Sequence, residues 1–82
     1  MLLTDDQVKS RLAENVNRLL AEREWSQADL ARATGESSAR VFNLLKARKL
    51  ASAGFILRVA EVLGVSTDYL YAPSRKNSEK IA

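Results

Sequence analysis

The chain has 82 residues, of which 46% are apolar, and its formal net charge is +3. This length allows one domain with a modest core, and a domain of this size gains stability from a partner subunit. The sequence contains neither Cys nor His, which excludes disulfides, zinc sites built from those residues and His-based catalysis. No constellation of carboxylates, nucleophile and base is visible, so we expect neither enzyme activity nor a cofactor.

No apolar run approaches the roughly 20 residues that a membrane span requires. Met1 to Leu3 leads directly into Asp5 and Asp6, and no signal peptide is visible. We therefore expect a protein of the cytoplasm that has no contact with a membrane.

Charge is distributed unevenly along the chain. Residues 5–24 contain five acids, whereas residues 37–60 contain none. The acid-free segment carries five basic residues, which are Arg40, Lys46, Arg48, Lys49 and Arg58. A one-sided basic segment is the usual electrostatic footprint of phosphate binding, and a merely solvated face is the alternative.

The first predicted helix begins at the capping residue Thr4 and runs to about Arg23. Its apolar stripe consists of Val8, Leu12, Val16, Leu19 and Leu20. A brief second helix follows, with Ser26 and Asp29 as a short capping box and Gly35 as its left-handed end.

A third helix is predicted over residues 38–47, capped by Ser37 or Ser38. Its core face consists of Val41, Leu44 and Leu45, and the opposite direction holds Ala39, Asn43 and Lys46. The major groove of B-DNA admits one helix, which must bury one face and present small or polar side chains on the other. The pattern therefore favours a DNA-reading helix, and ordinary packing within a helical protein is the alternative.

Ser52 is the predicted cap of a fourth helix that Gly64 ends, and Ser66 caps a short fifth helix that Pro73 ends. The core face of the fourth helix consists of Ile56, Val59, Ala60 and Leu63. We expect residues 1–72 to form one all-α domain, a compact five-helix bundle with a helix-turn-helix. Residues 73–82 are expected to be a disordered basic tail or a linker.

Two motifs flank the third helix at a fixed separation. Residues 26–31 read Ser-Gln-Ala-Asp-Leu-Ala, and residues 59–66 read Val-Ala-Glu-Val-Leu-Gly-Val-Ser. Together with Gly35, Val41 and Leu44, these motifs resemble the Cro/repressor (XRE-type) helix-turn-helix family of lambda-repressor-like DNA-binding domains. The resemblance covers about residues 10–72.

The resemblance implies that the second helix crosses the DNA backbone and that the third enters the major groove. By position, the implied base contacts are Ser37, Ser38, Ala39, Arg40, Phe42 and Asn43. The implied phosphate contacts are Ser26, Gln27, Lys46, Arg48 and Lys49. Asn43 is the best-placed reader, because an amide can pair bidentately with adenine.

Two departures from the family pattern concern the face that would meet DNA. Glu36 stands where the family usually has an apolar residue, and an acid beside the groove lowers affinity unless it pairs with Arg40, four residues on. Phe42 is bulky for a groove face. It can pack on a thymine methyl group, contact another protein or lie partly in the core.

Further departures concern how the third helix is held and how it ends. Leu20 and Leu45 replace a charged pair that is frequent in the family, which is compatible with apolar packing. Ala47 replaces the usual Gly after the third helix, and the usual Pro before the fourth is absent. The shape of this turn, and with it the placing of Arg48 and Lys49, is therefore open.

The resemblance implies a sequence-specific regulator of transcription that binds double-stranded DNA. The expected form is a repressor of phage or prophage type, associated with the nucleoid, acting as a homodimer on a palindromic operator with half-sites about 34 Å apart. Tyr69, Leu70 and Tyr71 are either core or dimer surface. The alternative is an antitoxin-like module that binds a protein partner as well as DNA, with Phe42 and the aromatic C-terminus as contacts.

Overall fold

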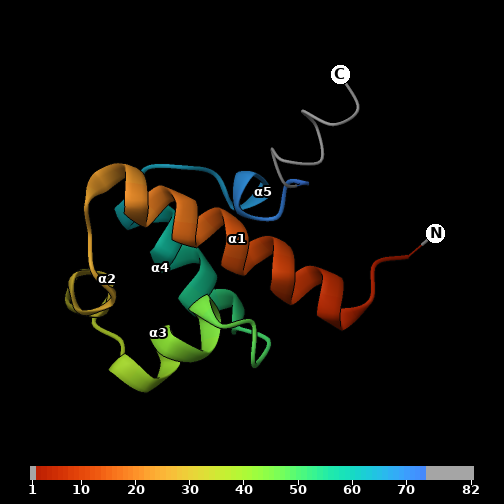
Figure 1. Ribbon diagram of the computed structural model, residues 1–82, viewed down its shortest axis with the longest axis horizontal. Helices are drawn as coiled ribbons and strands as arrows, with labels where there is room; N and C mark the ends of the chain where they lie inside the picture. The colour runs from red at the N-terminus through yellow and green to blue at the C-terminus, as the bar shows by residue number, and fades with distance from the viewer. Residues whose placement is uncertain (1, 74–82) are drawn as a thin grey trace.

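The computed structural model describes residues 2–73, and in that range the chain forms five helices and no strand (Figure 1). The helices are α1 (Asp5–Arg23), α2 (Gln27–Thr34), α3 (Ser38–Leu45), α4 (Ala53–Leu63) and α5 (Thr67–Leu70). The expected all-helical fold is confirmed. Of the tail expected over residues 73–82, only Pro73 lies within the described residues.

Every helix begins at a hydroxyl side chain that accepts a hydrogen bond from the backbone N–H three residues later. The capping residues are Thr4, Ser26, Ser37, Ser52 and Ser66. Such a cap satisfies one of the N–H groups that a helix start leaves without an intrahelical partner. Ser37, rather than Ser38, is therefore the cap of α3.

The core lies between α1 and the other helices. α1 packs against α3 and α5, and α2 packs against α3 and α4 (Figure 1). The core cluster includes Leu12, Val16, Leu19, Leu20, Leu30, Val41, Leu44, Phe55, Ile56, Val59, Leu63 and Leu70. Leu45 packs against it half-buried, so Leu20 and Leu45 both join apolar surroundings as expected.

The three residues of the aromatic C-terminal segment have different surroundings. Leu70 is fully buried and belongs to the core, whereas the side chain of Tyr69 remains partly exposed and Tyr71 is half-buried against the core. Phe55, which the sequence pattern did not assign to the core, is buried as well. No helix in the described part of the chain is long and apolar enough to cross a membrane.

Asn15 on α1 is buried and fastens the end of α5. Its amide nitrogen donates to the backbone oxygens of Leu70 at 2.8 Å and Ala72 at 2.9 Å, and its oxygen accepts from Arg18 at 3.0 Å. A four-residue helix has too few internal hydrogen bonds to persist alone. The Asn15 amide supplies donors to carbonyls that the helix end leaves free.

Replacing Asn15 with Ala should lower the free energy of unfolding by about 2–3 kcal/mol, because buried carbonyls lose their donor and a small cavity forms. Urea denaturation followed by circular dichroism measures this change. Asn15→Asp keeps the size but turns an oxygen toward those carbonyls, and it should be at least as harmful. An Asp variant as stable as the unaltered protein would show that the amide donors contribute nothing.

Candidate nucleic-acid interface

The start of α2 is fixed by a capping box. The Ser26 hydroxyl oxygen accepts from the N–H of Asp29 at 3.1 Å, and the Asp29 carboxylate accepts from the N–H of Ser26 at 2.8 Å. This arrangement leaves Gln27 as the first residue of α2. Its amide nitrogen donates to the backbone oxygen of Ser38 at 3.2 Å, which ties the start of α2 to the start of α3.

The same box determines the ionisation of Asp29. The hydrogen bond from the backbone N–H of Ser26 lowers the pKa of the carboxyl most, followed by the Ser26 hydroxyl, with a smaller contribution from nearby Arg32. Because folding lowers this pKa, the box contributes stability at neutral pH, and that contribution is lost as the pH falls through the lowered pKa.

The turn from α2 to α3 contains Gly35, whose φ of 73° is the left-handed conformation that Gly adopts without a steric cost. After the turn, α3 buries Val41 and Leu44. Its other residues face outward to different degrees: Ser38, Ala39, Arg40 and Phe42 are exposed and Asn43 is half-buried. All the residues expected to contact bases therefore lie on or beside the accessible part of α3, together with the exposed cap Ser37.

Phe42 is not part of the core, since 37% of its surface is exposed. The Lys46 ammonium lies 5.9 Å from the centre of its ring, and the Arg48 guanidinium lies 5.4 Å from it. Cations at these distances are attracted to the face of an aromatic ring. Phe42 thus gathers two of the predicted phosphate-binding cations at the end of α3.

α3 ends at Leu45, two residues earlier than the sequence pattern indicated. Ala47 adopts a φ of 56°, its N–H donates to the Leu44 oxygen at 3.2 Å, and the N–H of Arg48 donates to the Asn43 oxygen at 2.9 Å. These two bonds define a Schellman turn, which usually has Gly at the left-handed position. The chain keeps this type of turn with Ala.

A side chain from α1 also supports the end of α3. The amide of Asn17 donates to the Leu45 oxygen at 3.0 Å and to the oxygen of Ala13 in its own helix at 2.8 Å. An exposed polar residue of α1 thereby satisfies a carbonyl that the end of α3 would leave free.

A hollow of about 300 Å³ opens between α3 and the loop that leads to α4. Three residues that were expected to contact DNA line it, namely Arg40, Asn43 and Lys49. The rest of its wall consists of Leu44, Leu50, Ala51, Ser52 and Phe55. The hollow places cations and an amide around one depression beside α3.

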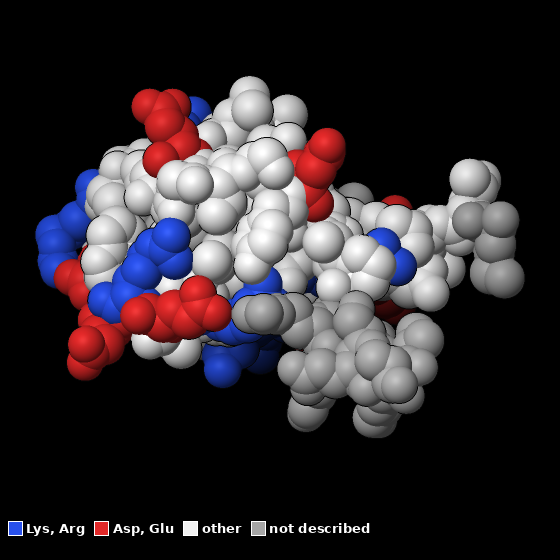
Figure 2. Space-filling model, turned by 90° about the horizontal axis from the view of Figure 1, so that it is seen from above, with Lys and Arg blue, Asp and Glu red and all other residues white. Residues whose placement is uncertain are grey.

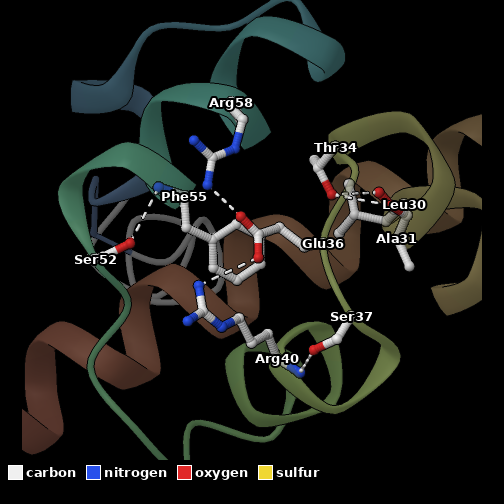
Figure 3. A network of polar contacts seen from close by, with 9 residues as sticks. All are labelled: Leu30, Ala31, Thr34, Glu36, Ser37, Arg40, Ser52, Phe55 and Arg58. Atoms are coloured by element: carbon white, nitrogen blue, oxygen red, sulfur yellow. Dashed lines mark hydrogen bonds and ion pairs between the residues drawn. The ribbon is translucent and has the colours of Figure 1, made fainter.

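Glu36, in the turn before α3, forms ion pairs with two arginines (Figure 3). One carboxylate oxygen lies 3.3 Å from Arg40, as the sequence suggested, and the other contacts Arg58 of α4. Arg58 was not among the predicted site residues. The only sequence signal for it is its place in the acid-free segment.

Acidic and basic side chains are interspersed on the face away from α3. Figure 2 views the molecule from above, whereas α3 is the lowest helix in Figure 1. Glu14 and Glu22 of α1, and Glu24 directly after it, are exposed. The segment from Ser37 to Ala60 contributes only basic charges, so the α3 side is the one suited to a polyanion.

Replacing Ala47 with Gly should stabilise the protein by about 0.5–1 kcal/mol, since a left-handed Ala carries a steric cost that exceeds the extra backbone entropy of Gly. Thermal and urea unfolding measure this difference. The matched control is Gly64→Ala, because Gly64 has a φ of 70° and an added Cβ would meet no atom within 4 Å. That control should lose about 1 kcal/mol. A neutral or destabilising A47G beside a destabilising G64A would refute strain at Ala47.

Comparison with known proteins gives matches to a family model and to solved structures. A family model described as helix-turn-helix matches residues 16–70, more than half of the chain. The crystal structure of the hypothetical transcription factor NHTF from Neisseria is similar in fold, with a TM-score of 0.81 and 25% sequence identity over 96% of this chain and 91% of that chain. A search among curated proteins gave no match.

Proposed function

The chain belongs to the XRE-type helix-turn-helix family, and we propose that it is a DNA-binding regulator of transcription, rather than an enzyme, that reads double-stranded DNA with α3. The observation that supports the proposal is that α3 has one buried side and one accessible side. This helix buries Val41 and Leu44, contains no acid, and leaves small, polar and basic side chains accessible beside Phe42. The acid that precedes it, Glu36, is paired with Arg40 and Arg58. The similar Neisseria protein is described as a hypothetical transcription factor.

In this proposal the start of α3 meets the base edges. Ser38 and Ala39 are small enough for close approach, and Ser37 retains its hydroxyl proton for donation while its oxygen caps the helix. Asn43 reads adenine through its amide, and Arg40 reaches a guanine or a phosphate. Phe42 lies with Lys46 and Arg48, which favours a place beside the DNA backbone or a thymine methyl group over a protein contact.

Phosphates are bound on both sides of α3. Ser26 and Gln27 lie at the positive end of α2, where backbone N–H groups and the helix dipole attract anions. The other phosphate contacts are Lys46, Arg48 and Lys49, whose side chains are exposed. Contacts of this kind position the protein on the duplex without reading its sequence.

We further propose that two copies bind a palindromic operator as a repressor of phage or prophage type. One short recognition helix covers few base pairs, so two copies with their α3 helices about 34 Å apart would reach successive major grooves. Leu50 and Leu57 are large apolar residues with 54% and 61% of their surfaces exposed, and they offer apolar area for contact between copies. An operator that overlaps a promoter would then block polymerase by steric exclusion.

Selection of bound duplexes from a random pool, followed by sequencing, tests this function. The unaltered protein should enrich a two-fold symmetric site, and Asn43→Ala should relax the preference at one base pair of each half-site, at a cost of about 1–3 kcal/mol per lost amide–base pairing. Gln7→Ala, which alters an amide in the first turn of α1, is the control and should keep the preference. Salt-sensitive binding without any enriched site would sink specific regulation by this chain alone.

A further inference from the structure

Glu36 lies where two helices of the interface meet. It stands in the turn before α3, and its two carboxylate oxygens contact two different arginines (Figure 3). Arg40 belongs to the first turn of α3, and Arg58 belongs to α4. The carboxylate therefore bridges the reading helix and the helix behind it.

The acid is much less accessible than either of its partners. Only 11% of the Glu36 side chain is exposed, against 63% for Arg40 and 48% for Arg58. A Cβ added at Gly54 would lie 3.4 Å from the Arg58 guanidinium. Arg58 thus lies back along α4, with one guanidinium nitrogen beside Gly54 and the other at Glu36.

This difference in exposure sets how the cluster responds to a polyanion. A nearly buried carboxylate that loses its cations is left with an uncompensated cost of desolvation. Each half-exposed arginine, in contrast, could bind either Glu36 or a phosphate. Glu36 is therefore an internal competitor for DNA phosphates. It opposes the transfer of Arg40 and Arg58 to any duplex, whatever the base sequence.

We infer that Glu36 is a positioning residue that restrains Arg40 and Arg58 and thereby suppresses binding to duplexes of arbitrary sequence. The inference rests on the proposal that α3 meets DNA. With both arginines held, the non-specific electrostatic attraction is weaker by two cations. The affinity for duplexes of arbitrary sequence is correspondingly lower, because phosphate contacts add affinity to every site alike.

The test is the salt dependence of binding to a duplex of random sequence. Glu36→Gln removes the charge and keeps the shape, and each released arginine that reaches a phosphate should steepen the slope of log K against log salt by about 0.9. Between about 50 and 200 mM salt, the loss of affinity should then grow about 3.5-fold for each such arginine. Glu61→Gln makes the same change of charge on the exposed side of α4 and should leave the slope nearly unchanged.

A second variant separates restraint from a purely structural role. When Glu36→Gln is combined with Arg58→Gln, the slope should fall part of the way back, because one of the released cations is gone. If Glu36 had only a structural role, the effect of Glu36→Gln on the slope would not depend on the charge at position 58. In the protein with Glu36 intact, Arg58→Gln should hardly alter the slope, while Lys49→Ala should lower it by about 0.9. This comparison stands even where a variant at Glu36 fails to fold.

The outcomes separate the restraint from the proposed function. Equal slopes for Glu36→Gln and Glu61→Gln would overturn the restraint while operator selection still stood. A slope lowered by about 0.9 in Arg58→Gln alone would do the same. A steeper slope for Glu36→Gln in a protein that selects no operator would support the restraint and contradict specific regulation. Absence of binding to any duplex, by the unaltered protein and by Glu36→Gln, would overturn both.

Discussion

The fastening of α3 is the constraint on which the rest of the interface depends. An isolated helix of eight residues is unstable in water, because too few hydrogen bonds offset the ordering of its backbone. The protein holds α3 by the burial of Val41 and Leu44, by the Gln27 bond at its start and by the Asn17 bond at its end. None of these attachments uses the exposed side chains of α3.

Charge is organised around the same helix. The acids of α1 are exposed, and the segment from α3 through most of α4 carries basic but no acidic residues. Glu36 is the exception, and the structure pairs it with two arginines instead of leaving it open to the groove. Phe42 adds local order by attracting Lys46 and Arg48. The basic charges are thus partly arranged before any DNA arrives.

Much of the fold could be predicted because its signals are local. A hydroxyl cap acts within three residues, and the apolar stripe of a helix repeats within two turns, so Ser26, Ser52 and the core faces of α1 and α4 were identified from the sequence. Partners far apart in the chain could not be found in this way. Asn15 meets the end of α5, and Arg58 meets Glu36, across separations that carry no periodic signal.

The turn after α3 could not be predicted from the sequence for a different reason. Ala47 gives no sign of a left-handed residue, since Ala rarely adopts that conformation, yet the Schellman bonds form around it. For the candidate site, the family resemblance supplied the residues, and the structure leaves most of those on α3 exposed. The individual base and phosphate contacts are still predictions, because specificity depends on the partner that each side chain meets.

The most direct measurement is a titration of the isotope-labelled protein with duplex DNA, followed by backbone amide chemical shifts in NMR. If α3 reads DNA, the shifts should change most at the start of α2 and from Ser37 to Lys49, and they should change little along the acidic face of α1. Changes centred on α1 or on Leu57, with α3 unaffected, would contradict the claim that α3 is the DNA-reading helix.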